Sequence, residues 1–146
     1  MDGWRLAEHF HGHAGWLAAA ALTHPAVVLR RKGRRAPWAV RLSVGLVTLV
    51  SLAGGVLYVP YRERLKQGIF QSAPQIGLLF ERKEHLAFGA LLFAWIGAVA
   101  YAASSKRDLP YAEGLHRLAH RAFVVAALLA IVVALLGTYV ASYRTF

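Results

Sequence analysis

The chain has no cysteine, and its only methionine is Met1. Without thiols it can form no disulfide, no thiolate metal site and no covalent haem attachment through a Cys-x-x-Cys-His motif, which excludes a c-type cytochrome. The soft ligands that a cuprous site requires are missing for the same reason. The sequence also lacks a His-Glu-x-x-His pattern, which argues against a zinc hydrolase.

Acidic residues are few: the chain has 7 aspartates and glutamates and 17 lysines and arginines. Its net charge is therefore +10. A positive charge of this size is found in nucleic-acid-binding proteins as well as in membrane proteins. Here the basic residues flank long apolar segments and form no separate basic surface interleaved with aromatic residues. We therefore expect no nucleic-acid partner, and we expect anionic lipid headgroups as the counterions.

Apolar sequence is what the chain has in abundance, with a hydrophobic fraction of 58%. A bilayer core about 30 Å thick is crossed by a helix of about 20 apolar residues, and a helix satisfies its own backbone hydrogen bonds there. Four segments meet this requirement, at residues 9–29, 38–59, 85–103 and 116–140. The sequence therefore predicts an all-α fold, an integral membrane four-helix bundle that forms a single domain over residues 1–146, with an outer loop at 60–84.

The placement of charge predicts the topology of these four crossings. The short connection at 30–35 is rich in arginine and lysine and has no acidic residue, so the positive-inside rule places it in the cytoplasm. The connection between the third and fourth segments carries Lys106 and Arg107 and belongs on the same side. Both termini and the loop at 60–84 then lie on the outer, periplasmic side. We expect a multi-pass protein of the bacterial inner membrane, in contact with the lipid bilayer.

The seven histidines lie almost entirely at the ends or inside of the apolar segments. His13 and His24 are eleven residues apart, so on an ideal helix they differ by about 20° in direction and about 16 Å in height. His9 lies four residues before His13 and falls on the same stripe. His116 and His120 share one face of the fourth segment in the same way.

The depth of these histidines in the membrane predicts how they pair. With the N-terminus outside, His13 lies near the outer end of the first helix, and His85 enters the third helix from the same surface. His24 lies near the cytoplasmic end of the first helix, and His120 lies a few residues into the fourth, which begins at the cytoplasm. The sequence therefore predicts two opposed imidazole pairs, one near each membrane surface.

Opposed imidazoles are the axial ligands that an iron porphyrin needs, together with cations near its propionates. The expected cations at the outer surface are Arg82, Lys83, Arg62 and Arg64, and those at the inner surface are Arg117, Arg121 and Arg30. His9 and His116 are reserve ligands, because a histidine at a helix end is also a common interfacial residue wetted by headgroups.

This arrangement resembles small four-helix b-type membrane cytochromes, in which facing histidines on neighbouring helices hold one or two haems. The residues that carry the resemblance are His13, His24, His85 and the His116-Arg117-x-x-His120-Arg121 segment. The resemblance implies haem b as the cofactor and electron transfer to or from quinone or a partner redox subunit. It also implies a subunit of a larger respiratory oxidoreductase complex rather than a stand-alone enzyme, with the 60–84 loop as its docking surface.

Two other readings stay open at this point. The chain is alternatively a cofactor-free accessory subunit of a respiratory or photosynthetic complex, whose histidines only form hydrogen bonds. A small transporter or proton path through His24, Glu84 and His85 is the other alternative, although internal repeats are expected there and only Pro25 interrupts a helix. For His24 itself we consider three roles: a hydrogen bond to a neighbouring helix, a partner for the carbonyl that Pro25 frees, or a metal ligand.

Overall fold

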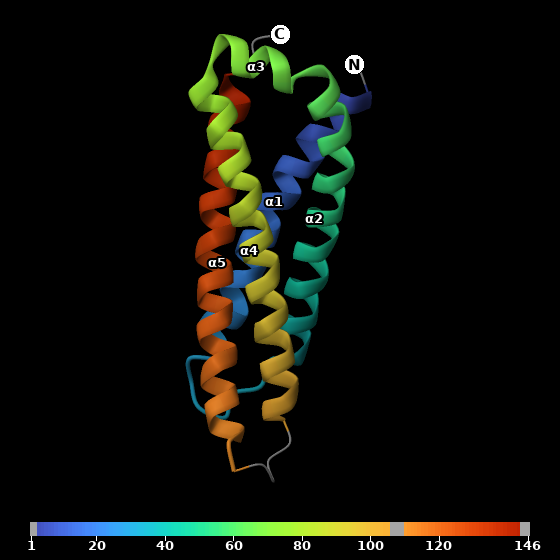
Figure 1. Ribbon diagram of the computed structural model, residues 1–146. Helices are drawn as coiled ribbons and strands as arrows, with labels where there is room; N and C mark the ends of the chain where they lie inside the picture. Colours follow the sequence, from blue (N-terminus) through green and yellow to red (C-terminus); the bar gives the residue numbers. More distant parts are fainter. Residues whose placement is uncertain (1–2, 106–109, 144–146) are drawn as a thin grey trace.

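The computed structural model describes residues 3–105 and 110–143, and every secondary-structure element within them is a helix. This confirms the all-α prediction. The elements are α1 (Gly3–Val28), α2 (Pro37–Arg64), α3 (Lys66–Ser72), α4 (Pro74–Ser104) and α5 (Ala112–Ser142). The four long helices run side by side, and the short α3 crosses one end of them (Figure 1).

The long helices pack in the order α1, α2, α4 and α5, and α5 closes back onto α1. The first residues of α1, the whole of α3 and the last turn of α5 lie at one end of the molecule (Figure 1). We call this the α3 end. The connection between α1 and α2 lies at the opposite end, beside the start of α5 (Figure 1). Residues 29–36 make this connection, and Gly33 supplies the positive φ of 72° that its turn requires. Only glycine adopts such a φ at no steric cost.

The core between the long helices is built mainly from small residues. Alanine and glycine let helix backbones approach closely, which is how helices associate where lipid removes the usual hydrophobic driving force. Larger side chains then fill the remaining gaps, and Phe123 and Leu22 are fully buried among them. The buried alanines are Ala18, Ala19 and Ala26 of α1, Ala90, Ala94 and Ala100 of α4, and Ala119, Ala122, Ala126, Ala127 and Ala130 of α5.

Three of the described helices, α2, α4 and α5, are long and apolar enough to span a membrane. Large apolar side chains such as Leu52, Val56 and Val99 lie exposed on their outer faces, which is compatible with contact to a lipid bilayer. The chain thus has the character of a multi-pass membrane protein. The fourth expected crossing, at 9–29, corresponds to α1, which does not reach the same hydropathy because four of the seven histidines lie on it.

The expected outer loop at 60–84 is instead helical over most of its length. Pro60 lies inside α2 rather than at its end, and Pro74 occupies the first turn of α4, where proline favours helix initiation. Tertiary packing sustains these helices: the Tyr61 ring stacks on Phe80 with the ring centroids 3.9 Å apart, and Ile69 is buried beside them. The mixture of charge with apolar residues such as Ile69 and Phe80 was expected of an interfacial helix or a partner contact, and these two side chains are instead buried within the chain.

An ion pair also ties α3 to α4 at this end. Nζ of Lys66 lies 2.7 Å from a carboxylate oxygen of Glu81. The hydrogen bond to Glu81 raises the pKa of Lys66 above its ordinary value. The pair is partly exposed, and such pairs add little stability, so the apolar contacts decide how firmly α3 is held.

Gly77 of α4 lies directly against the Phe70 ring of α3. A Cβ at Gly77 would lie 2.6 Å from Cε2 of Phe70, so Gly77→Ala forces the half-buried Phe70 ring to move. We expect a local destabilisation of about 1 kcal/mol, which raises the population in which α3 is undocked about fivefold. Amide hydrogen exchange of residues 66–72 measures this. Gly68→Ala is the matched control, because a Cβ there meets nothing within 4 Å, and equal exchange in both variants would contradict the expected contact.

Candidate functional site

The histidines of α1 divide between its two faces. Each residue of an α-helix turns by about 100°, and on this spacing His11 falls on the packed face of α1 whereas His9, His13 and His24 fall on the opposite face. Burial in the structure agrees, since His11 is half-buried and the other three are exposed. The packed face is defined by Ala18, Ala19, Leu22, Pro25, Ala26 and Leu29. The stripe that was expected to point into the bundle is thus its outer face.

His13 and His85 share one hydrogen-bond pattern at the α3 end. Nδ1 of His13 lies 2.7 Å from the His9 carbonyl oxygen, and Nδ1 of His85 lies 2.8 Å from that of Glu81. A carbonyl oxygen only accepts, so Nδ1 donates the proton in both rings. In a neutral imidazole this leaves a lone pair on Nε2, which is the tautomer that a metal ligand needs. Both side chains are exposed, on faces turned away from the packed sides of α1 and α4.

His24 and His120 were the expected pair at the other end, and the structure places them differently. His24 is exposed on the outer face of α1, whereas His120 is half-buried on α5. Nδ1 of His120 is buried and has no hydrogen-bond partner in the described part of the chain. The two side chains therefore have different surroundings, and only His120 lies partly within the helix packing.

The carbonyl oxygen that Pro25 leaves without a helical donor does not bond to His24, which was one of the roles considered for that residue. Pro25 has no N–H for the carbonyl of Ala21, and the hydroxyl of Ser43 on α2 donates to that oxygen at 2.6 Å. Ser43 is buried and also lies 2.6 Å from the carbonyl oxygen of Ala39 in its own helix. The role of carbonyl partner thus belongs to Ser43, which leaves His24 free for contacts outside this chain.

Among the remaining expected site residues, His116 forms a hydrogen bond between two helix ends and the arginines are exposed. Nε2 of His116 lies 3.1 Å from the carbonyl oxygen of Leu29, so it donates a proton that joins the start of α5 to the end of α1. With Nε2 used in this way, a metal would be held only through Nδ1 of His116. Arg82, Arg117 and Arg121 are exposed. Lys106 and Arg107 lie outside the described residues.

Sequence reasoning missed a polar group inside the α3 end. The His11 ring lies against α2, with Cε1 only 3.0 Å from where a Cβ on Gly54 would be. Lys83 of α4 lies within electrostatic range of His11, its Cδ lies 3.8 Å from a Cβ position on Gly137, and its Nζ lies 4.3 Å from the centroid of the Phe80 ring. The spacing of alanine and leucine along α1 was the signal that could have placed His11 inside.

Within residues 3–105 and 110–143, no group of three or more histidine, aspartate or glutamate side chains is placed to hold a metal ion. A haem held by two histidines does not require such a group. Comparison of the chain with protein families, with characterised proteins and with solved structures finds no match. The resemblance to b-type cytochromes therefore stays a prediction.

Proposed function

We propose that the chain crosses the membrane four times, with α1 as the fourth crossing and the 29–36 connection in the cytoplasm. Two features support this. First, α1 packs along both α2 and α5 rather than standing apart from them, so it shares their depth. Second, the basic residues at 30–35 gather at one end of the molecule, opposite the α3 end (Figure 1), as the positive-inside rule expects of a cytoplasmic end. Both termini then lie on the periplasmic side of a bacterial inner membrane.

We propose that this membrane protein is a b-type cytochrome subunit that passes electrons to or from quinone or a partner redox subunit. The observation that carries the proposal is the shared state of His13 and His85, each with Nδ1 bonded to its own helix and a lone pair on Nε2. Fixing Nδ1 in this way orients an imidazole and raises its basicity as a ligand. Haem, when bound, would supply the one-electron chemistry.

The positions of the candidate ligands favour a haem whose two axial ligands come from different chains. His13 and His24 lie on the outer face of α1, and His85 lies on the outer face of α4. These positions support ligands that point away from the bundle rather than toward one another. We therefore propose that each bound haem lies at an interface and takes its second ligand from a neighbouring subunit.

His24 supports an interface on this face independently of haem. An imidazole that faces hydrocarbon is unfavourable, and ionisable groups at membrane depth usually pair with a partner or face a protein interior. His24 lies on the exposed side of α1 within an apolar run. A neighbouring helix that covers this side removes it from lipid. Arg82 is three residues before His85 and is exposed, so it would meet a propionate of a haem bound there.

A pyridine haemochrome assay on the full chain, purified in mild detergent from its native membrane with its partners, tests the proposal. We expect haem b in the wild type and at least about a tenfold loss in His13→Ala or His85→Ala, because a ligand is removed. His116→Gln is the matched control, since His116 already donates to Leu29 and glutamine keeps a donor there. Equal haem in all three variants would remove these ligand assignments.

A cofactor-free accessory subunit is the second candidate. The exposed positions of His9, His13 and His24 favour it, because a row of imidazoles on one helix face suits hydrogen bonds to a partner helix as well. Wild-type protein that co-purifies with its partner but shows no reduced haem bands would establish this candidate in place of the first.

A further inference from the structure

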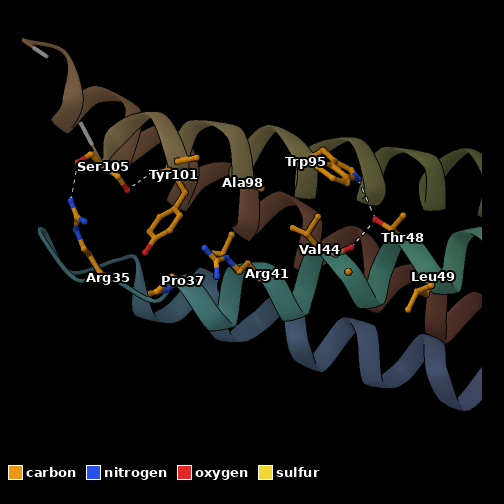
Figure 2. Close-up of a pocket in the computed structure, with 13 residues that line it drawn as sticks. Arg35, Pro37, Arg41, Val44, Thr48, Leu49, Trp95, Ala98, Tyr101 and Ser105 are labelled. Carbon is orange, nitrogen blue, oxygen red and sulfur yellow. Dashed lines mark hydrogen bonds between the residues drawn. The ribbon is translucent and has the colours of Figure 1, made fainter. Parts of the chain in front are cut away.

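An elongated groove of about 730 Å³ lies between α2 and α4, near the 29–36 connection (Figure 2). Its wall is mostly apolar and includes Val44, Leu49 and Ala98. Gly45 widens the groove, since a Cβ at this position would meet nothing within 4 Å. The groove is therefore wide enough for a hydrocarbon chain, and it lies where the topology places the cytoplasmic membrane surface.

The mouth of the groove is cationic. Arg35 and Arg41 line it, and no acidic residue or histidine is among the described residues that do. Nη2 of Arg35 donates to the carbonyl oxygen of Ser105 at 3.1 Å, which holds the guanidinium across the gap between the two helices (Figure 2). The guanidinium of Arg41 lies 5.8 Å from the centroid of the Trp38 ring. Two fixed positive charges without a carboxylate favour an anionic group.

Tyr101 adds a hydrogen-bond donor at the same mouth. Its hydroxyl oxygen accepts the backbone N–H of Ala36 at 3.0 Å, which leaves the hydroxyl proton for another acceptor. Phosphate oxygens accept both this kind of donor and the planar guanidinium of arginine.

Deeper in the groove the polar groups already have partners. Nε1 of Trp95 donates to Oγ1 of Thr48 at 3.2 Å, and Thr48 donates to the carbonyl oxygen of Val44 at 2.7 Å (Figure 2). The surface that remains for a ligand there is apolar. A molecule that matches both the cationic mouth and the apolar inner wall of the groove has an anionic head and a hydrocarbon tail.

We propose that this groove binds an acidic phospholipid, with its phosphate at Arg35 and Arg41 and one acyl chain along Val44, Gly45 and Ala98. Basic pockets between membrane helices at the cytoplasmic side are suited to anionic headgroups. The inference rests on the membrane placement of α2 and α4 and does not depend on haem binding. A quinone has no charge to match the two arginines, so we take it as the competing occupant.

The test reconstitutes the full chain, with its partners, in nanodiscs of phosphatidylcholine with a minor fraction of phosphatidylglycerol, and native mass spectrometry counts the retained lipids. We expect the wild type to retain phosphatidylglycerol in preference to phosphatidylcholine. Arg35→Gln/Arg41→Gln should retain it about tenfold less. Arg31→Gln/Arg34→Gln is the matched control, because it removes the same charge from the same end at positions that do not line the groove.

A second variant keeps the test valid if the arginine variant is poorly folded. Gly45→Leu fills the apolar part of the groove without changing any charge, and the open space at Gly45 lets the chain fold around it. We expect it to lose retained lipid while keeping its thermal transition in detergent. Equal lipid retention in the arginine variant and its control would overturn the proposal, and so would displacement of the lipid by a short-chain quinone.

Discussion

Phe123→Ala is expected to lower the free energy of unfolding by about 3 kcal/mol, the low end of what such a truncation costs in a core. The Phe123 ring is fully buried and packs on Gly97 of α4, where a Cβ would lie only 2.9 Å from the ring atoms. Alanine at 123 leaves a cavity between α4 and α5. The low end applies because lipid is as apolar as the core, so the transfer contribution shrinks and the lost packing dominates.

Unfolding in increasing fractions of a denaturing detergent, followed by circular dichroism, measures this change. Leu128→Ala is the control on the same helix, because Leu128 is 59% exposed and should cost less than about 0.5 kcal/mol. Gly97→Val sharpens the test. Alone it should destabilise by clashing with Phe123, whereas in the Phe123→Ala background it should restore stability by filling the cavity. The same sign in both backgrounds would contradict the packing of Phe123 on Gly97.

Hydropathy predicted where the helices lie in the sequence, but it did not predict which face of each helix is buried. In a soluble protein the apolar stripe of a helix points inward, whereas here exposed Leu52 and Val56 are as apolar as the core residues. Apolar residues therefore do not identify the buried face of α1. The polar histidines were used instead, and His13 and His24 were expected to point inward. Close packing of small residues decided the orientation instead, which turned those two histidines outward.

Tertiary contacts also explain why the 60–84 segment differed from its pattern. A proline at 60 and mixed charges are typical of a loop, yet the stacking of Tyr61 on Phe80 and the burial of Ile69 supply packing that no local pattern contains. His11 was missed for a related reason. The spacing of alanine and leucine along α1 indicates the buried face on which His11 lies, but its place beside Gly54 depends on how α1 packs against α2, and a single helix does not carry that information.

Ser43→Ala is expected to lower the free energy of unfolding by about 2 kcal/mol. The carbonyl of Ala21 has no helical N–H partner because residue 25 is proline, and the Ser43 hydroxyl is the group that donates to it. Ser43 is only 1% exposed, so alanine leaves a polar oxygen unsatisfied inside the α1 and α2 contact. Such a group costs about 1–3 kcal/mol, and a lipid surrounding offers no water to replace the donor.

Pro25→Ala provides a control that isolates this hydrogen bond. Alanine at 25 restores the N–H that bonds the Ala21 carbonyl within α1, so Ser43→Ala in that background should cost less than about 1 kcal/mol. The coupling between the two substitutions, measured by the same detergent unfolding, should therefore exceed about 1 kcal/mol, as for other residues that share one hydrogen-bond network. Additive effects would show that Ser43 stabilises the chain through its bond to Ala39 or through packing, and not through the carbonyl that Pro25 frees.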